Sequence, residues 1–295
     1  MSSIKALSVV IPVYNEEEVI ISTIDKIHSI LKKLNIVYEI VVVNDGSTDR
    51  TSEVLMSYGG EIVLLNRDVN RGYGFSLKEG IERATGDWIL ITDADGTYPL
   101  EDIPLFVSEC SHADMIVGER SGKSVRMGLF NKLAKVILKK LIYILAYKWV
   151  TDINSGLRLF KKEMALRYWD IYPDGFSFTT TLTVAAIIEK YKVKYIPINY
   201  YKRTGKSHIK PMRDFFSFVF LILRIVTFFR PLRFFLPISF CFFVFSVVRS
   251  LRDIFITNAI GTFAVLLFII SIQSFFFGLL ADLIVVKFRG KRINI

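Results

Sequence analysis

The stretch WILITDADGT, residues 88–97, is the strongest indication of the fold: an apolar run that predicts a strand ends directly in two carboxylates. Trp88–Thr92 is short, almost continuously apolar and rich in β-branched residues, which predicts a strand buried on both faces, as in a parallel sheet. Asp93 and Asp95 follow it, and paired carboxylates suit a hard cation such as Mg²⁺ or Mn²⁺ that bridges to a substrate diphosphate. The alternative is two solvated carboxylates in a turn before Gly96, because a lone DxD string has little specificity.

Strand and helix patterns alternate up to about residue 200. Four more apolar runs predict strands, namely Ala6–Ile11, Tyr38–Val43, Glu61–Leu65 and Ala113–Val117. Helical patterns lie between the runs, at Glu16–Leu34 and Tyr73–Ala84. The alternation predicts an α/β, Rossmann-like, doubly wound and mainly parallel sheet, in which ligands bind at the carboxyl ends of the strands.

Polar strings occur at those carboxyl ends. PVYNE (12–16), NDGSTD (44–49) and GER (118–120) follow the first, second and fifth predicted strands. Asp45 can accept hydrogen bonds from a nucleobase or ribose; alternatively its segment caps the next helix, because Ser47, Thr48 and Asp49 are good capping residues. The glycine-rich turn NRGYG (70–74) can bring backbone N–H groups to a phosphate or ribose.

Basic residues predict phosphate contacts. Arg120, Arg126 and Arg203 lie in predicted loops or strand ends, and arginine forks match phosphate oxygens. An enzyme that joins two phosphate-bearing substrates needs several such groups, whereas each residue alone could belong to a solvated basic face. Gly128–Lys148 carries lysines on one side and apolar residues largely on another, which predicts a helix that lies on an anionic membrane or packs on the core.

The composition is both apolar and basic: 52% of the 295 residues are hydrophobic, and the formal net charge is +10. This combination indicates a membrane surface with anionic head groups. Nucleic acid is not expected as a partner, because much of the basic charge lies beside apolar segments. Cys110 and Cys241 allow no disulfide framework or zinc site, and no secretory signal is expected, so the chemistry is placed on the reducing, cytosolic side.

The C-terminal part is predicted to be a membrane unit. Phe215–Phe229 is too short to span a bilayer and carries Arg224 in its middle, so it is expected to lie in the interface. Phe234–Val248 with its flanks and Ala259–Val286 are predicted to span the bilayer, joined by a loop over Arg249–Asn258. The alternative is a buried helical hairpin of a soluble domain.

These patterns predict three parts: a catalytic domain over residues 1–212, an interfacial amphipathic helix over 213–230, and a two-helix transmembrane hairpin with a basic C-terminal tail over 231–295. Basic residues before and after the hairpin outnumber those in its loop, which predicts that both ends and the catalytic domain face the cytosol. The spans could also associate copies of the chain into a homo-oligomer.

Seven strings together resemble the inverting GT-A nucleotide-sugar transferases, and more narrowly the polyprenyl-phosphate glycosyltransferases of the dolichol-phosphate mannose or glucose synthase type. In chain order they are IPVYNEEE (11–18), VVVNDGSTD (41–49), DADGTYP (93–99), GER (118–120), DINSGLRLF (152–160), GFSFTTTL (175–182) and YKRTGKS (201–207). The resemblance implies a GT-A fold, a nucleotide-sugar donor, a polyprenyl or dolichyl monophosphate acceptor, and Mg²⁺ or Mn²⁺.

The resemblance also implies roles for individual residues. Those implied for the donor nucleoside and diphosphate are Pro12, Tyr14, Glu16, Asp45, Asp93, Ala94, Asp95 and Arg203, with Asp93 and Asp95 also holding the metal. Arg120 and Arg126 are implied for the acceptor phosphate, and Asn154, Ser155 and Gly156 for the floor of the sugar pocket. The sequence departs from the family at Asn44, Thr97 and His208; the first two departures leave the nucleotide and the third metal ligand open.

The implied reaction transfers the sugar to the lipid phosphate by an inverting displacement. The acceptor oxygen is ionised near neutral pH, so positioning and charge stabilisation by the metal and the arginines replace a strong general base. DADGTYP (93–99) is slightly more similar to the glucose or UDP-sugar branch, which favours UDP-glucose over GDP-mannose. A membrane polysaccharide synthase of the same fold and an inactive membrane scaffold or binding module are the alternatives.

Overall fold

The computed structural model describes residues 4–120, 136, 140, 143, 150–174, 177–201, 224 and 227–291, with side chains as far as residue 287. Arg126, Arg203, most of Gly128–Lys148 and most of segment 213–230 lie outside these residues, so the predictions made for them stay predictions. The chain divides into two units, Met1–Phe218 and Val219–Ile295, which are described separately. The three-part division made from the sequence also stays a prediction.

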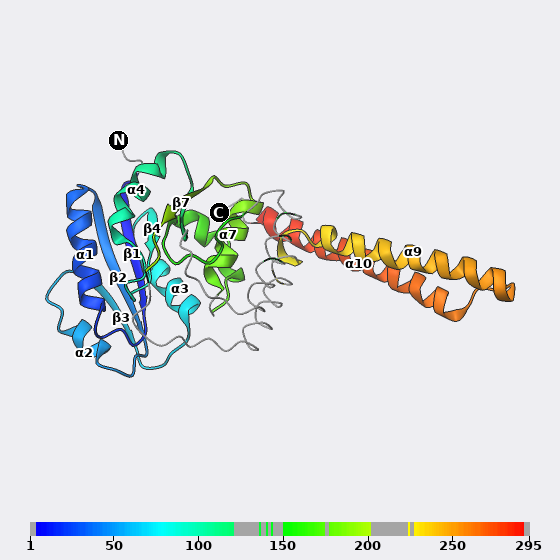
Figure 1. Cartoon of the computed structure of the whole chain (residues 1–295), viewed down its shortest axis with the longest axis horizontal. Coiled ribbons are helices and arrows are strands. Elements are labelled where there is room, and N and C mark those ends of the chain that lie inside the picture. Colours follow the sequence, from blue (N-terminus) through cyan, green and yellow to red (C-terminus); the bar gives the residue numbers. More distant parts are fainter. Residues whose placement is uncertain are drawn as a thin grey trace. The chain divides into compact units, whose positions relative to one another are not determined.

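The first unit is built on one seven-stranded sheet with the strand order β3-β2-β1-β4-β6-β5-β7 (Figure 1). Its strands are β1 (Ala6–Val13), β2 (Val37–Asp45), β3 (Val63–Arg67), β4 (Trp88–Ile91), β5 (Met115–Arg120), β6 (Arg158–Lys161) and β7 (Val193–Ile198). All neighbouring strands are parallel except that β6 runs antiparallel to both β4 and β5. The predicted α/β fold with a mainly parallel sheet is therefore confirmed.

Helices cover both faces of the sheet, as a doubly wound architecture requires (Figure 1). One face carries α1 (Ile20–Lys33) and α4 (Ile103–Ser108), and the other carries α3 (Tyr73–Arg83) and α7 (Phe178–Ile188). The shorter helices are α2 (Thr51–Met56) and α6 (Lys162–Leu166). Most of β1, β2, β4 and β5 is buried on both faces because each face meets a helical layer.

Helix α1 shows how sequence spacing builds the core. Its Ile20, Ile24, Ile27 and Leu31 recur every three or four residues, so they fall on one helical face, and all four are fully buried. Burying each such side chain contributes about 1.5–3 kcal/mol. On the opposite face of the sheet, Gly80 of α3 approaches the sheet so closely that a Cβ would collide with the side chain of Val10.

The topology decides where a ligand can bind. The strand order reverses at β1, which has β2 on one side and β4 on the other. Ligands of open α/β sheets bind at the carboxyl ends of the strands at such a switch point. Because β6 runs antiparallel to its neighbours, the segment before it, residues 152–157, reaches the same edge. The loops after β1, β2, β4 and β5 and the loop before β6 therefore share one edge of the sheet.

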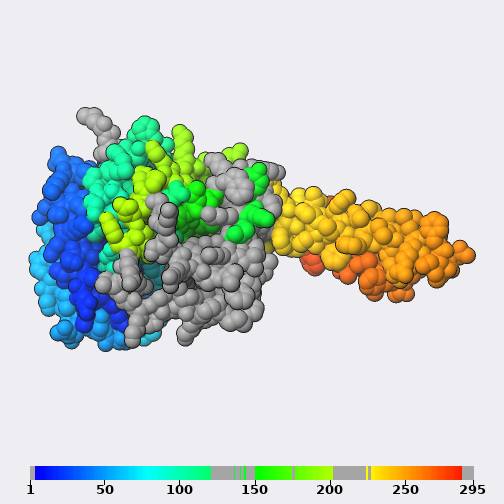
Figure 2. Space-filling model, viewed as in Figure 1, coloured from blue at the N-terminus to red at the C-terminus, as the bar shows by residue number. Residues whose placement is uncertain are grey.

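The second unit is a helical hairpin of α9 (Pro231–Thr257) and α10 (Thr262–Lys291). The two helices lie side by side along their length (Figures 1 and 2). Both are long and apolar enough to cross a bilayer. At about 1.5 Å per residue, the 27 residues of α9 extend about 40 Å, which exceeds the roughly 30 Å hydrocarbon core of a membrane.

The predicted loop over Arg249–Asn258 is wrong in extent, because α9 continues through Arg249 to Thr257. Only the short segment from Asn258 to Gly261 reverses the chain. Asn258 adopts a left-handed conformation with φ 55°, and its N–H donates to the carbonyl of Ile254, which ends the helix. Arg249 does not interrupt α9 because it pairs with Asp253 one turn later, at 3.1 Å.

Small polar residues hold the hairpin together. Ser239 Oγ donates to the carbonyl of Ser271, and Ser271 Oγ donates to the carbonyl of Ser239, both at 2.9 Å. We call this reciprocal pair the serine clasp. Nearer the turn, Ser246 Oγ donates to the carbonyl of Ala264 at 2.8 Å. Small residues at an interface between membrane helices let the backbones approach closely enough for such contacts.

Candidate active site

The loops after β1 and β2 are joined into one unit by Asn15. Its N–H donates to Ser47 Oγ at 3.0 Å, and its side-chain oxygen accepts the N–H of Thr48 at 2.7 Å. Two residues that the resemblance implies for the nucleoside precede this junction in the chain. Pro12 is buried in β1, whereas Tyr14 is 38% exposed where the strand ends. Tyr14 therefore offers an accessible aromatic ring at the switch point.

A second set of contacts fixes the next few residues. The Glu16 N–H donates to Thr51 Oγ1 at 3.0 Å. Asp49 accepts the N–H of Thr51 at 2.9 Å with one oxygen and the N–H of Glu17 at 3.3 Å with the other. Asp49 therefore organises the loop by joining Glu17 to the first residue of α2, whereas the N-cap position itself is Arg50.

Asp45, at the end of β2, holds the glycine-rich turn before α3. Its Oδ1 accepts the N–H of Arg71 at 2.9 Å, and its Oδ2 accepts the N–H of Gly72 at 2.7 Å. Gly72 has φ 103°, a conformation that favours glycine. Asp45 is only 4% exposed, so it shapes this turn. The N–H groups of Arg71 and Gly72, expected to face a phosphate or ribose, are bonded to Asp45 instead.

Asp93 lies between a tyrosine hydroxyl and a glycine backbone. Tyr73, the first residue of α3, donates its hydroxyl to Asp93 Oδ1 at 3.0 Å. On the other side, a Cβ added to Gly156 would lie 2.6 Å from Asp93 Oδ2. The Gly156 N–H in turn donates to the hydroxyl oxygen of Tyr98 at 2.6 Å. Asp93 is thus positioned by residues from α3 and from the loop before β6.

Both tyrosines remain protonated at any ordinary pH. Burial raises the pKa of Tyr73, and the nearby charge of Asp93 raises it further. Burial and the same carboxylate also raise the pKa of Tyr98. Tyr73 is therefore a permanent hydrogen-bond donor to Asp93.

Asp95 is nearly buried, with 8% exposure. Its Oδ1 accepts both the N–H and the hydroxyl of Thr97, at 3.1 Å and 2.6 Å. Thr97 stands where the resemblance leaves the third metal ligand open, and here it orients Asp95. Between the two carboxylates, the carbonyl of Ala94 accepts a hydrogen bond from Thr23 of α1 at 3.3 Å, which anchors the segment to the core.

The carboxylate pair fits a hard divalent cation that a substrate completes. In the part of the chain that the structure describes, no three or more His, Cys, Asp or Glu side chains are grouped as a metal site. A complete protein cage is not required, because Mg²⁺ is commonly held by one or two carboxylates together with substrate phosphates. Asp93 and Asp95 could therefore hold Mg²⁺ or Mn²⁺ together with a diphosphate.

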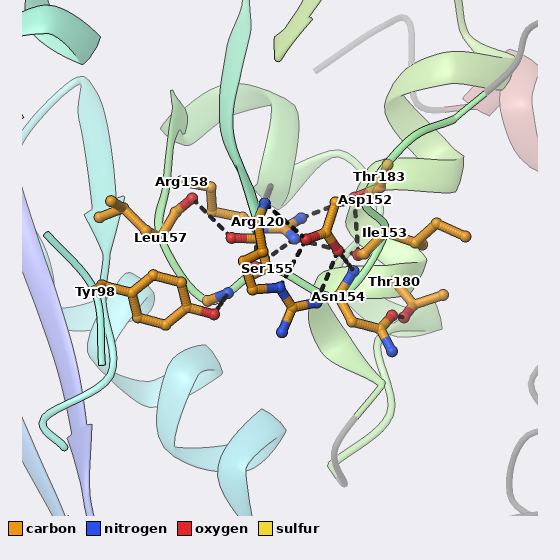
Figure 3. A network of polar contacts seen from close by, with 11 residues as sticks. Tyr98, Arg120, Asp152, Ile153, Asn154, Ser155, Leu157, Arg158, Thr180 and Thr183 are labelled. Carbon is orange, nitrogen blue, oxygen red and sulfur yellow. Dashed lines mark hydrogen bonds and ion pairs between the residues drawn. The ribbon is translucent and has the colours of Figure 1, made fainter. Parts of the chain in front are cut away.

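Arg120, at the end of β5, forms a two-pronged ion pair with Asp152 (Figure 3). Its Nε donates to Oδ2 at 2.7 Å and its Nη2 donates to Oδ1 at 2.8 Å. Burial alone would raise the pKa of Asp152, but the hydrogen bonds and charge of Arg120 outweigh it and lower the pKa. A phosphate that binds Arg120 must therefore bind a guanidinium that is already hydrogen-bonded to Asp152. The ion pair with Asp152 fixes the direction in which this guanidinium points.

The loop before β6 carries the three residues implied for the sugar-pocket floor. The N–H of Asn154 donates to Asp152 Oδ1 at 3.1 Å, and the Asn154 side-chain oxygen accepts the hydroxyl of Thr180 from α7 (Figure 3). Gly156 packs against Asp93, as described above. Ser155, in contrast, is fully buried. Its side chain therefore faces the interior, and only its backbone could contribute to a pocket.

The structure brings most of the predicted residues to one edge of the sheet. They are Pro12, Tyr14, Glu16, Asp45, Asp93, Ala94, Asp95, Arg120, Asn154, Ser155 and Gly156. Arg126 and Arg203 lie outside the described residues. Sequence reasoning did not single out Tyr73, Tyr98, Asp152 or Arg158. The available signal was their place inside NRGYG, DADGTYP and DINSGLRLF, strings whose other members were assigned.

The fold is an α/β domain with carboxylates gathered at the carboxyl edge of its sheet, and comparison with known proteins identifies its family. The model of glycosyl transferase family 2 matches residues 8–169, more than half of the chain, and the chain belongs to that family. A second model, the GtrB C-terminal hairpin, matches residues 230–286. The resemblance drawn from the motifs is thereby confirmed.

Several curated relatives are similar at about 30% identity. The low-salt glycan biosynthesis hexosyltransferase Agl6 of Haloferax volcanii is 31% identical over 214 residues, which cover 70% of this chain and 51% of the relative. The dolichyl-phosphate beta-glucosyltransferase ALG5A of Trichomonas vaginalis is 30% identical over 172 residues, 53% of each chain. An undecaprenyl-phosphate 4-deoxy-4-formamido-L-arabinose transferase of Pectobacterium atrosepticum is 34% identical over 170 residues, 56% of this chain and 51% of the relative. The chain thus spans about half the length of these relatives.

A solved structure with the same fold is glucosyl-3-phosphoglycerate synthase from Mycobacterium tuberculosis, in complex with Mn²⁺, uridine diphosphate and glucosyl-3-phosphoglycerate. The TM-score is 0.58 at 19% identity, and the match covers 76% of this chain and 79% of the other. At this identity the likeness supports the GT-A fold alone.

Proposed function

We propose that this chain transfers a sugar from a nucleoside-diphosphate sugar to a polyprenyl monophosphate at a membrane surface. The observation that carries the proposal is the Asp93–Asp95 pair, held after β4 beside the switch point at β1. The hairpin of α9 and α10 suits a lipid acceptor, because it is apolar enough to remain in the bilayer. The names of the relatives support the acceptor class, since two of them act on dolichyl or undecaprenyl phosphate.

The donor is proposed to bind at the switch point between β1 and β4. Pro12, Tyr14 and Glu16 would contact the nucleoside, and Asp45 would support it through the turn that it holds. Asp93 and Asp95 would hold Mg²⁺ or Mn²⁺, and the cation would supply positive charge to stabilise the departing diphosphate. The manganese bound by the solved structure with the same fold supports this choice of metal.

Among possible donors, UDP-glucose is favoured and GDP-mannose is the rival. The string DADGTYP (93–99) and the similarity to a dolichyl-phosphate beta-glucosyltransferase support glucose. The formamido-arabinose relative indicates that this family accommodates other sugars as well.

The acceptor phosphate oxygen would attack the anomeric carbon from the face opposite the leaving group. A new oxygen–carbon bond forms, the bond from the anomeric carbon to the diphosphate oxygen breaks, and the nucleoside diphosphate leaves with the electron pair. The phosphate carries its negative charge before it attacks, so no strong base is needed. Arg120, oriented by Asp152, and Arg126 would hold the acceptor phosphate, while Arg203 would cover the donor diphosphate.

The catalytic domain is proposed to face the cytoplasm, with the hairpin crossing the membrane and returning. Arg230 and Arg233 precede the hairpin, and Lys287 with the basic tail follows it, which supports cytoplasmic ends. Association of copies through the hairpin stays a prediction.

The test offers radiolabelled UDP-glucose, UDP-N-acetylglucosamine and GDP-mannose to membranes that contain the protein and polyprenyl phosphate, with Mn²⁺ or with a chelator. We expect a metal-dependent, lipid-extractable product from at least one donor, and no product from Asp93→Asn or Asp95→Asn. The matched control is Asp25→Asn, an exposed carboxylate on α1, which should keep full activity.

Two results would contradict the proposal. If no donor gives a labelled lipid, the proposed reaction is contradicted. If Asp93→Asn keeps full activity, the assignment of the metal site to Asp93 is contradicted. A polymeric product without lipid would instead support the polysaccharide synthase.

A further inference from the structure

Arg158 is a fully buried arginine in the middle of the sheet. It is the first residue of β6, where it pairs with Ile91 of β4 on one side and with Val117 of β5 on the other. Its exposure is 0%, and among the residues that the structure describes it is the largest fully buried side chain. Arginine is almost never fully buried unless it is paired, so this position needs an explanation.

The guanidinium of Arg158 is bonded to two segments at once (Figure 3). Toward the loop before β6, Nε and Nη2 donate to the carbonyl of Ser155 at 3.0 Å and 2.5 Å, and Nη2 also donates to the carbonyl of Ile153 at 3.2 Å. Toward α7, Nη1 donates to the carbonyl of Thr179 and to Thr183 Oγ1, both at 2.8 Å. One side chain therefore ties the loop to the helix.

All of these partners are neutral. Within the described residues, no carboxylate accepts a hydrogen bond from Arg158, whereas Arg120 nearby is paired with Asp152. Burial lowers the pKa of the guanidinium, but an arginine stays charged in proteins. The charge of Asp152 attracts the guanidinium only without a direct hydrogen bond to it. Burying a charge whose direct partners are all neutral is costly, and apolar residues often provide the same stability at lower cost. Stability of the core alone is therefore a poor reason for an arginine here.

The loop that Arg158 holds carries the floor residues. Asn154 lies between the two carbonyls that Arg158 binds, at Ile153 and Ser155. Gly156 follows directly and packs against Asp93. A shift of this loop would move both the proposed sugar-pocket floor and the backbone that bounds the metal-binding carboxylate.

The chemistry of this clamp requires a guanidinium. Arginine offers five N–H donors in one rigid plane, which lets it bond several carbonyls on two sides. Lysine keeps the charge but has a single nitrogen at the end of a flexible chain, so it cannot reproduce the pattern. A lysine at this position therefore separates the effect of the charge from the effect of the fork.

We propose that Arg158 is a positioning residue that fixes the loop of residues 153–156 against α7 and thereby aligns the donor sugar with the acceptor phosphate. It touches no substrate itself and acts through the backbone of the loop. The alignment part of this proposal rests on the proposed function, whereas the holding of the loop does not.

The test compares Arg158→Lys with Phe160→Leu in the full-length protein. Phe160 is also fully buried in β6 and lies two residues away, on the same face of the strand, so its truncation loosens packing without removing the clamp. We expect Arg158→Lys to lower kcat about 100-fold, as for a displacement of about 1 Å at the reacting atoms, with KM for the nucleotide sugar nearly unchanged. Thr183→Val, which removes one of the partners, should show a smaller loss of kcat in the same direction.

A second measurement is independent of sugar transfer. Hydrogen exchange of the backbone amides in residues 152–158 should become faster in Arg158→Lys. In Phe160→Leu the same amides should exchange as in wild type. The two variants are compared under conditions that match their unfolding temperatures. Peptides from β1 and β2 should exchange alike in both variants, because the clamp does not reach them.

The outcomes are separable. If wild type transfers no sugar, the proposed function fails, and hydrogen exchange still decides whether Arg158 holds the loop. If wild type is active and Arg158→Lys loses no more kcat than Phe160→Leu at equal loss of unfolding temperature, the positioning role is overturned. Unchanged exchange over 152–158 in Arg158→Lys would overturn it as well.

Discussion

Asp93 depends on Tyr73 for its orientation, and this contact can be removed by deleting one oxygen atom. In Tyr73→Phe the ring keeps its place, but Asp93 Oδ1 loses the hydrogen bond measured at 3.0 Å. Removing a residue that orients a metal ligand typically weakens metal binding 10–100-fold. We expect the Mn²⁺ concentration for half-maximal transfer to rise about tenfold, with kcat at saturating Mn²⁺ little changed.

The control for this change is Tyr58→Phe, because the hydroxyl of Tyr58 also donates to an aspartate, Asp25, but on the surface. Its Mn²⁺ dependence should match wild type. An unaltered Mn²⁺ dependence in Tyr73→Phe would show that the hydroxyl does not support a metal ligand.

The ion pair of Asp152 with Arg120 makes the stability of the folded protein depend on pH. The pKa of Asp152 in the folded protein is lowered, so its contribution is complete above the unfolded value of about 3.9 and is lost as the pH falls through the folded-state pKa. Asp152→Asn leaves Arg120 buried without its partner, which should cost about 3 kcal/mol at neutral pH.

Thermal unfolding in detergent measures this effect at several pH values. The difference between wild type and Asp152→Asn should be constant near neutral pH. It should shrink below about pH 4, where the unfolded chain takes up the proton first, and vanish as the pH falls through the lower pKa of the folded protein. Asp25→Asn, at an exposed position, should show little difference at any pH. A difference that grows in acid would contradict the pairing.

Among the elements, the serine clasp between α9 and α10 can be tested as a unit. Its two hydrogen bonds are reciprocal, so removing either hydroxyl leaves one bond, and removing both leaves none. Hydrogen bonds between membrane helices contribute about 0.6 kcal/mol on average and up to about 1.7 kcal/mol. We expect Ser239→Ala and Ser271→Ala together to lower the stability of the hairpin by about 1 kcal/mol.

Unfolding of the protein in mixed micelles, with the single and double variants compared, provides the measurement. Ser250→Ala is the control, because Ser250 lies on α9 outside the clasp. A double variant as stable as this control would contradict a stabilising role for the clasp.

The strands that sequence reasoning recovered are those with continuous apolar runs. β1, β2, β3, β4 and β5 lie within a few residues of the predicted ranges. The reason in four of them, all but the partly buried β3, is that a strand buried on both faces is largely apolar. β6 and β7 were not predicted. β6 is short and begins with Arg158, whereas β7 alternates in burial at the edge of the sheet and contains Pro197.

Helix α7 was also missed, for a different reason. Its sequence FTTTLTVAAII is rich in β-branched residues, which favour strands. Every residue from Phe178 to Ile188 is buried, so tertiary packing overrides the local preference. The hydroxyl of Thr183 is also satisfied within the helix, because it donates to the carbonyl of Thr179 at 2.9 Å.

The candidate site also contains some residues that could be identified from the sequence and others that could not. Asp93 and Asp95 could be selected because they end a recognisable buried strand. Arg158 and Asp152 could not, because their importance arises from contacts with α7 and β5, which lie far away along the chain. A charged residue inside a sheet carries no local signal that distinguishes a clamp from a surface position.

For the whole molecule, the hairpin predicts a topology that labelling can test. The turn at Asn258 should face away from the cytoplasm, whereas both chain ends should face it. The native cysteines interfere little, because Cys110 is buried and Cys241 lies within α9 and can be replaced by serine. In a Cys241→Ser background, we expect Asn258→Cys to react with an impermeant maleimide added outside intact cells, and a cysteine at the C-terminus to react only after lysis.

Labelling of both positions from outside, or of neither before lysis, would contradict two spans with cytoplasmic ends. Retention of the protein in the membrane after a carbonate wash should accompany the expected pattern, because two apolar helices resist extraction.

The antiparallel strand β6 has a consequence for how the protein is made. β1 to β4 come from residues 6–91, and β5 to β7 come from residues 115–198, so each side of the sheet is one stretch of chain. Among the described strands, the four-residue pairing of β4 with β6 is the one strand pairing that joins the two sides, and Asp93 and Gly156 lie across this seam. As the chain leaves the ribosome, the first side can form while its β4 edge is still open. Catalytic competence is therefore expected to begin only when β6 emerges and closes the seam, so a truncated nascent chain would have the carboxylates without the loop that bounds them.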